Sequence, residues 1–155
     1  MAEISLQQLS AFIVRAKAQT YVGDGRPTLS HRPGSHDLEY REGDFAYLDS
    51  YYGSADFIGE EVVYFEGEAV WAMNYYGRLL QPEKLTAAEA GQVIKAALSA
   101  LYREGRFLGG FRHEAHGSTY VDTNEGSVAS FMGREWIERD NVVVYDLVYH
   151  GGLIR

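Results

Sequence analysis

Aromatic and polar side chains alternate along several short segments of this chain, in the pattern that a small-molecule pocket needs. Tyr47, Asp49 and Tyr51 are spaced two residues apart, so they would share one face of an extended strand. Aromatic rings provide flat contact area, while a few carboxylates and amides orient a ligand. A solvent-exposed sheet face with tyrosine ladders would show the same pattern. The residues expected to bind a ligand are Tyr47, Asp49, Tyr51, Asn74, Tyr76, Asp146 and His150, with Arg32 and Asp37 from a loop.

Catalytic arrangements are few. Alternation along a strand sends Glu60 and Glu61 to opposite faces, which argues against a carboxylate pair for acid–base catalysis. His113 and His116 are three residues apart, but they fall at an expected hairpin turn, and no longer zinc pattern accompanies them. No Gly-x-Ser-x-Gly motif occurs. We therefore predict no catalytic residue, no metal ligand and no cofactor.

Residues 47–80 recur in degenerate form at 120–154. The first copy begins Tyr-Leu-Asp-Ser and the second begins Tyr-Val-Asp-Thr. Such an internal repeat predicts two similar halves related by a pseudo-twofold axis, with a shared face or groove as the natural binding place. Positions kept in both copies are best explained by what the fold requires twice, so we expect Glu61 and Glu135 to accept hydrogen bonds from turn amides. Positions that differ, such as Asn74, Tyr76, Asp146 and His150, are freer to serve a site.

The elements that position these residues are readable from periodicity. Two helices are predicted at 6–18 and 87–104, because each begins with a capping box and continues with an apolar stripe. Segments rich in tyrosine and β-branched residues, separated by short turns, predict antiparallel strands. The strands are expected at 36–41, 44–52, 56–66, 69–76, 110–115, 118–124, 128–138 and 142–150. The residues between 19 and 35 would form a long loop.

The predicted fold class is therefore α+β. An α-β-β-β-β unit would occur twice, at about 5–80 and about 86–155, in a single domain of 155 residues. Its curved antiparallel sheet of about eight strands would carry both helices on one face. Phe12, Phe57, Trp71, Leu98, Phe131 and Tyr145 are the expected core.

Composition limits the classes of function. A formal net charge of −8, with no run of basic residues, makes direct nucleic-acid binding unfavourable. The chain has no cysteine, which excludes disulfides and thiolate metal sites and favours a cytoplasmic location. No apolar stretch approaches the length that a membrane span requires, and the first residues lack the features of a signal peptide.

Several motifs resemble those of an uncharacterised bacterial family of domains of unknown function. They include Trp71-x-Met73-Asn74-Tyr75-Tyr76-Gly77, a His150-Gly151-Gly152 ending, and the run from Arg32 to Asp44, so the likeness covers nearly the whole chain. Members of that family occur alone or behind a helix-turn-helix module. The resemblance implies a sensor or effector-binding role, which in this chain would need a separate regulatory partner.

Three functions remain open. The first is a non-enzymatic domain that binds or senses a small neutral or cationic molecule. The second is a small hydrolase or lyase that uses His150 with Asp146 or Asp49. The third is a protein-interaction module, with a homodimer as one form.

Overall fold

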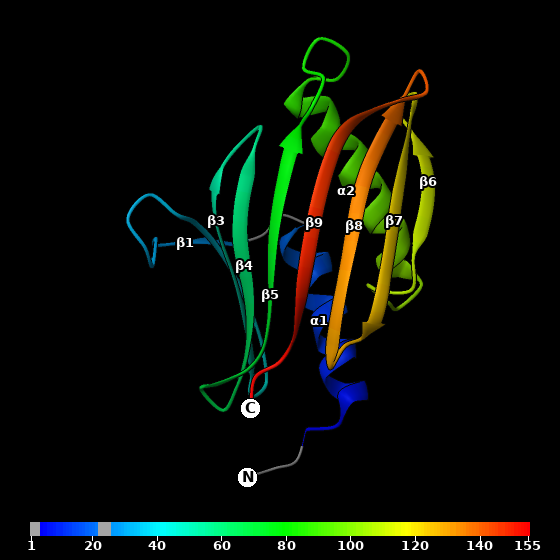
Figure 1. Cartoon of the computed structure of the whole chain (residues 1–155). Helices are drawn as coiled ribbons and strands as arrows, with labels where there is room; N and C mark the ends of the chain where they lie inside the picture. The colour runs from blue at the N-terminus through cyan, green and yellow to red at the C-terminus, as the bar shows by residue number, and fades with distance from the viewer. Residues whose placement is uncertain (1–3, 22–25) are drawn as a thin grey trace.

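The computed structural model describes residues 4–21 and 26–155. These residues form two helices and nine strands, with the helices in one layer on one face of a single sheet (Figure 1). The elements are α1 (Leu6–Thr20), β1 (Arg26–Thr28), β2 (His36–Glu42), β3 (Phe45–Gly53), β4 (Phe57–Phe65), β5 (Glu68–Leu79), α2 (Ala87–Arg103), β6 (Phe111–Ala115), β7 (Ser118–Ser127), β8 (Ser130–Arg139) and β9 (Val142–Leu153).

Both helices begin where their capping boxes predict. The Ser5 hydroxyl accepts from the Gln8 amide at 3.1 Å, and the Thr86 hydroxyl accepts from the Glu89 amide at 3.2 Å. The reciprocal bonds from the backbone amides of Ser5 and Thr86 are also present, so two otherwise unpaired amides are satisfied at each start. The two predicted helices are thus confirmed. Among the described residues, neither helix is long and apolar enough to cross a membrane.

All neighbouring strands are antiparallel, in the order β1-β2-β3-β4-β5-β9-β8-β7-β6. The eight predicted strands are present within a few residues of their expected ends. The ninth, β1, was expected to be loop. It has only three residues, including Pro27, and its pairing with Leu38 on β2 makes it an edge strand. Three residues are too few to show alternation, so only the tertiary pairing defines this strand.

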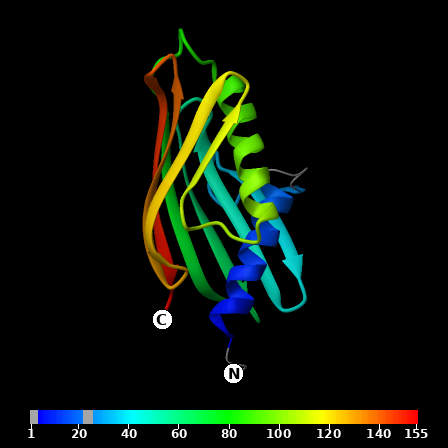
Figure 2. The same ribbon diagram turned by 90° about the vertical axis from the view of Figure 1, so that its right-hand side faces the viewer.

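The meander β2 to β5 follows α1, the meander β6 to β9 follows α2, and β5 pairs with β9 at the centre of the sheet. The predicted duplication and pseudo-twofold axis stay predictions. Figure 2 shows the sheet curving around both helices, which lie on the same face. We call this the covered face and the other the open face.

The core fills the space between the helices and the covered face. Trp71 is fully buried, its ring stacks on Phe131 at 5.8 Å between centroids, and its indole N–H donates to the Val128 carbonyl at 3.0 Å. Five of the six expected core side chains are buried: Phe12, Trp71, Leu98, Phe131 and Tyr145. The sixth, Phe57, is only half-buried, because it lines a hollow beneath the helices.

Candidate functional site

The structure separates the expected ligand-binding residues into two groups on opposite faces. Tyr47 and Asp49 lie beneath the helices with exposed fractions of 0% and 1%. Asn74, Tyr76 and His150 lie exposed on the open face. The residues that we expected to bind one ligand therefore do not share one face of the sheet.

The strand register explains the separation. Asp49 on β3 pairs with Glu61 on β4, and Glu61 pairs with Met73 on β5. Residues that pair directly in a sheet share a face, so Asp49 lies on the same face as Met73. Asn74 is the next residue after Met73, so it lies on the opposite face. A sequence gives the alternation within each strand, but it does not give the register between strands.

The remaining expected residues make contacts of their own. Asp37 is buried and accepts hydrogen bonds from Ser35 and Ser50 at 2.8 Å each and from the His31 amide at 2.9 Å. Burial opposes ionisation, yet these hydrogen bonds lower the pKa of Asp37 to about 2. Asp37 thus anchors the loop before β2.

Arg32 extends from that loop and pairs with Glu60 at 3.1 Å. On the open face, Asp146 accepts from the Arg134 guanidinium at 2.8 Å. His150 lies four residues along the same strand, and Asp49 lies on the other face, so neither carboxylate is brought to His150.

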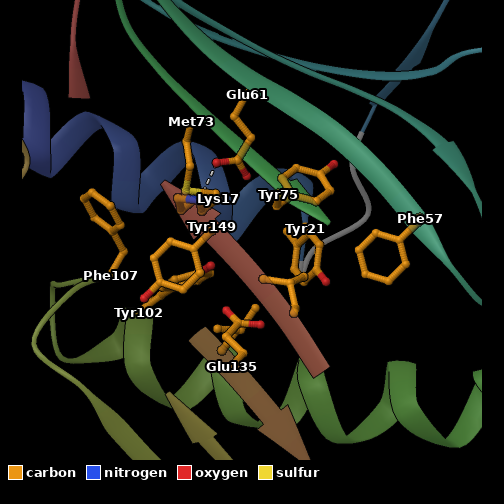
Figure 3. Close-up of a pocket in the computed structure, with 12 residues that line it drawn as sticks. Lys17, Tyr21, Phe57, Glu61, Met73, Tyr75, Tyr102, Phe107, Glu135 and Tyr149 are labelled. Carbon is orange, nitrogen blue, oxygen red and sulfur yellow. Dashed lines mark hydrogen bonds and ion pairs between the residues drawn. The ribbon is translucent and has the colours of Figure 1, made fainter. Parts of the chain in front are cut away.

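An internal cavity of about 40 Å³ lies between the helices and the covered face. Figure 3 shows Tyr21 and Phe57 at one end, Phe107 at the other, and Lys17 with Glu61 between them. Half of its lining residues are aromatic, and the wall also carries one ammonium and two carboxylates. Its lining residues are Lys17, Tyr21, Phe57, Glu61, Met73, Tyr75, Leu98, Tyr102, Phe107, Glu135, Leu147 and Tyr149.

Lys17 is a buried cation that the sequence analysis missed. Its Nζ lies 2.5 Å from Glu61 Oε2 and 5.5 Å from the centre of the Phe107 ring (Figure 3). Glu61 therefore accepts from a lysine rather than from the turn amide that we expected. A signal was present: Lys17 follows Ile13 by four residues, so it falls on the apolar stripe of the helix, where a charged residue must find a buried partner.

A second pattern occurs once in each half of the sheet. The Tyr75 ring on β5 passes over Gly59 on β4, and its hydroxyl donates to Asp49 Oδ1 at 2.6 Å. A Cβ at position 59 would lie 2.4 Å from the Tyr75 oxygen, so only glycine leaves room for this ring. We call these three residues the first Tyr-Gly-Asp unit.

The second Tyr-Gly-Asp unit consists of Tyr149, Gly133 and Asp122. The Tyr149 hydroxyl donates to Asp122 Oδ1 at 2.7 Å, and a Cβ at position 133 would lie 2.3 Å from the Tyr149 oxygen. In each half, a buried aspartate on the covered face thus accepts a hydrogen bond from a tyrosine hydroxyl.

These carboxyl groups retain protons more strongly than in water. Burial, followed by repulsion from Glu61, raises the pKa of Asp49 to about 7, although the Tyr75 hydrogen bond and Lys17 oppose the rise. Burial raises the pKa of Asp122 to about 6 against the hydrogen bonds that it accepts. Burial and then repulsion from Asp122 raise the pKa of Glu135 to about 8. The site therefore exchanges protons near neutral pH.

Two tyrosines with buried hydroxyls lie beside these groups. The oxygens of Tyr47 and Tyr120 are buried, and no described residue gives either of them a hydrogen bond of normal geometry. Burial, followed by the nearby charges of Glu61 and Glu135, raises the pKa of Tyr47 and of Tyr120 respectively. Glu61 and Glu135 are therefore polar neighbours of these two hydroxyls.

A larger hollow of about 560 Å³ reaches the first Tyr-Gly-Asp unit from outside. Tyr21, Phe57 and Tyr75 line both this hollow and the internal cavity, so the two spaces adjoin. Asp49 and Tyr51 lie on its wall, and Gly91, Ile94 and Lys95 form the side that belongs to α2. Of the residues expected from sequence, Tyr47, Asp49 and Tyr51 are thus gathered on the covered face, two of them at the hollow.

The described residues contain no group of three or more histidine, aspartate or glutamate side chains placed to hold a metal ion. Comparison with known proteins gave no match among curated proteins and none among solved structures. The profile of one family, described as Domain of unknown function (DUF5680), matches residues 49–154. The match begins at Asp49 of the first Tyr-Gly-Asp unit, so it leaves out α1, β1, β2 and the first part of β3 and covers α2 and the later strands. The chain therefore belongs to the DUF5680 family of domains of unknown function.

Proposed function

We propose that this protein is a small-molecule binding domain whose ligand occupies the hollow between α2 and the first half of the sheet. The observation that carries the proposal is a hollow of about 560 Å³ whose wall includes a carboxylate, Asp49, with an exposed fraction of only 1%. Ligand sites are typically concave and mostly apolar, with a few polar groups that fix orientation. This hollow has that composition.

The charges around the hollow favour a neutral or cationic ligand. Asp49 and Glu61 lie close enough to repel each other, and Lys17 only partly offsets this repulsion, while Lys95 and His36 also line the hollow. Protonation of Asp49 near pH 7 relieves part of this repulsion. A cation would relieve it without a proton, whereas an anion would meet a carboxylate. The family resemblance adds a sensing role, in which a regulatory partner responds to the bound molecule.

The hydrolase or lyase that we considered has less support, because His150 lies on the open face away from both proposed carboxylate partners. A homodimer is our second candidate. Ile58, Tyr76, Val148 and Met132 are exposed on neighbouring strands of the open face, and such a surface is typical of protein contacts. Sedimentation at increasing concentration tests this candidate, and a Val148→Lys protein should then be more monomeric.

The binding proposal is tested by closing the hollow. Gly91 on α2 lines it, and a Cβ there would meet no atom within 4 Å. Gly91→Trp should fill the hollow without distorting the helix. Native mass spectrometry of the purified protein should show a retained small molecule on the wild-type chain that is lost from Gly91→Trp.

Gln92→Trp is the matched control, because Gln92 is exposed on the same helix and does not line the hollow. It should retain the molecule at the wild-type level. Equal retention by Gly91→Trp, or a wild-type protein that carries no molecule and takes up none from a cell extract, would contradict the proposal.

A further inference from the structure

The two Tyr-Gly-Asp units differ in one neighbour. In the second half, Asn124 on β7 pairs with Gly133, and its side-chain amide reaches the unit. In the first half, Tyr51 on β3 pairs with Gly59 and occupies the corresponding place. The Cβ atoms that glycine 133 and glycine 59 lack would lie 2.8 Å from Asn124 Cβ and 2.7 Å from Tyr51 Cβ, which shows how closely the two places correspond.

Asn124 closes the second unit by donating hydrogen bonds. Its Nδ2 donates to Asp122 Oδ2 at 3.1 Å and to the Tyr149 oxygen at 2.9 Å. Its Oδ1 accepts from the Gly109 amide at 2.8 Å. The second carboxylate therefore has a donor on each oxygen, both supplied by the protein.

The segment before β6 covers this closed unit. The Arg106 guanidinium donates to the carbonyls of Leu108 and Gly110 at 2.7 and 2.9 Å and thereby holds the turn that carries Gly109. Nothing further is required to satisfy Asp122, and Asp122 lines neither the internal cavity nor the hollow.

The first unit lacks this closure. Tyr75 donates to Asp49 Oδ1, but no hydrogen bond from any residue that the structure describes reaches Asp49 Oδ2. Tyr51 presents a ring here instead of an amide, and Asp49 lines the open hollow. The first unit is thus a buried carboxyl group with one oxygen unused and a path to it from outside.

We propose that the ligand carries an NH₂ donor group, as in a carboxamide or an amidine, which binds Asp49 Oδ2 and the Tyr75 oxygen as the Asn124 amide binds the second unit. This inference rests on the proposed binding function and names the chemical class of the ligand. The flat group attached to the NH₂ would lie among the rings of Tyr21, Tyr51 and Phe57, which line the same hollow. A site built around an unused acceptor discriminates strongly against an analogue without the donor, because the acceptor would then stay unpaired.

Three probes of one shape test the donor group on the full chain. Benzamide and benzamidine carry NH₂, while acetophenone has the shape of benzamide with a methyl group in its place. Isothermal titration calorimetry or ligand-observed NMR should show that benzamide and benzamidine bind at least tenfold more tightly than acetophenone. Equal binding of all three would overturn the inference but leave the binding function standing. Failure of all three to bind would overturn the inference, and retention in native mass spectrometry would then judge the binding function separately.

A pair of variants tests the position. Tyr51→Asn introduces the residue type that closes the second unit. Tyr51→Leu introduces a side chain of similar shape to asparagine that has no hydrogen-bond donor. Both variants remove the Tyr51 ring, so a loss of benzamidine affinity that is common to both reports only the lost contact with that ring. We expect Tyr51→Asn to bind benzamidine at least tenfold more weakly than Tyr51→Leu, with a melting temperature at least as high. Equal affinities for the two variants, with both folded by circular dichroism, would overturn the proposal.

Discussion

At the scale of single residues, the most consequential feature is Asp49, a buried carboxyl group that accepts a hydrogen bond from Tyr75. Burial, followed by repulsion from Glu61, raises the pKa of Asp49 to about 7, against its 2.6 Å hydrogen bond from Tyr75 and the buried Lys17. A group that titrates near neutral pH changes its charge with small changes in surroundings. A ligand that binds beside Asp49, as we propose, would therefore be coupled to the protonation of this carboxyl group.

The raised pKa values predict how stability depends on pH. Asp122, Asp49 and Glu135 have pKa values of about 6, 7 and 8 in the folded protein and about 4 when unfolded, so the folded chain binds more protons between pH 4 and 8. The free energy of unfolding should therefore fall as pH rises through this window, by up to about 1.4 kcal/mol per pH unit for each group. Asp37, with its lowered pKa, acts in the opposite direction below pH 4.

Asp49→Asn should remove one part of this dependence. The groups facing Asp49 are Glu61, Tyr75, Lys17 and Asp37, and none of them is changed by the substitution. Urea denaturation between pH 5 and 7 should show a shallower loss of stability than in the wild type. Asp44→Asn, at an exposed turn, is the control and should leave the slope unchanged. A variant with the wild-type slope would show that Asp49 is already ionised at pH 5.

Residue types alone identified Tyr47, Asp49 and Tyr51 as a group, because period-two spacing places them on one face. They did not identify Lys17, whose partner is 44 residues away, since a buried ion pair depends on the packing of a helix against a strand. Residue types also led us to group Asn74 and His150 with Asp49. Which side of each strand faces the helices depends on the register between neighbouring strands from β3 to β9, and residue types do not give that register.

At the scale of elements, glycine on β4 and β8 makes room for a tyrosine from the adjacent strand. Gly59 pairs with Tyr75 and Gly133 with Tyr149 in equivalent registers. Without a Cβ the ring can lie flat over the glycine and reach the strand beyond it. Strand sequences normally avoid glycine, so its occurrence here shows that close approach outweighs the propensity cost.

Gly59→Ala should therefore damage both the fold and the site. The new Cβ would lie 2.4 Å from the Tyr75 oxygen and 2.7 Å from Tyr51 Cβ, so the ring must move and its hydrogen bond to Asp49 must lengthen. We expect a loss of about 1–3 kcal/mol in chemical denaturation, as for other overpacked sites. Gly91→Ala is the control, because a Cβ at this position on α2 would meet no atom within 4 Å. It should be neutral or stabilising by up to about 1 kcal/mol. A neutral Gly59→Ala would show that the ring has room to spare.

Long periodic elements were predictable from sequence, whereas β1 was not. Both helices carry a capping box and an apolar stripe, which are local signals. The three residues of β1 are extended because β2 offers an unpaired edge, and that edge exists only in the folded sheet.

At the scale of the whole molecule, the two halves of the sheet are joined along β5 and β9. Trp71 from the first half stacks on Phe131 from the second and meets Phe107 edge-on at 5.9 Å. Lys17 from α1 also lies over Phe107. Among the described residues, buried apolar side chains from both halves form one cluster, so the core is continuous across the junction.

Trp71→Ala should weaken the entire molecule. Removing a fully buried indole should cost about 3–5 kcal/mol and shift one cooperative transition to lower denaturant. Trp136→Ala is the control, because Trp136 is only partly buried and packs under Arg134 at 4.9 Å, and it should cost about 1 kcal/mol or less. Two separate transitions in far-ultraviolet circular dichroism, or a loss below about 1 kcal/mol for Trp71→Ala, would show that the halves are independent.

The different surroundings of the two indoles also give the protein a built-in optical reporter. Trp71 is shielded from solvent and lies at the junction of the halves, so its fluorescence should be blue-shifted and resistant to acrylamide. The Trp136 ring lies on the open face with the Arg134 guanidinium over it, and it should emit at longer wavelength. Of the two, Trp71 lies nearer to the proposed ligand site, because Met73, two residues along the same strand, lines the internal cavity that adjoins the hollow. A spectral change on ligand addition that persists in Trp136→Phe would therefore come from the interior, and it would allow binding to be followed in the unlabelled protein.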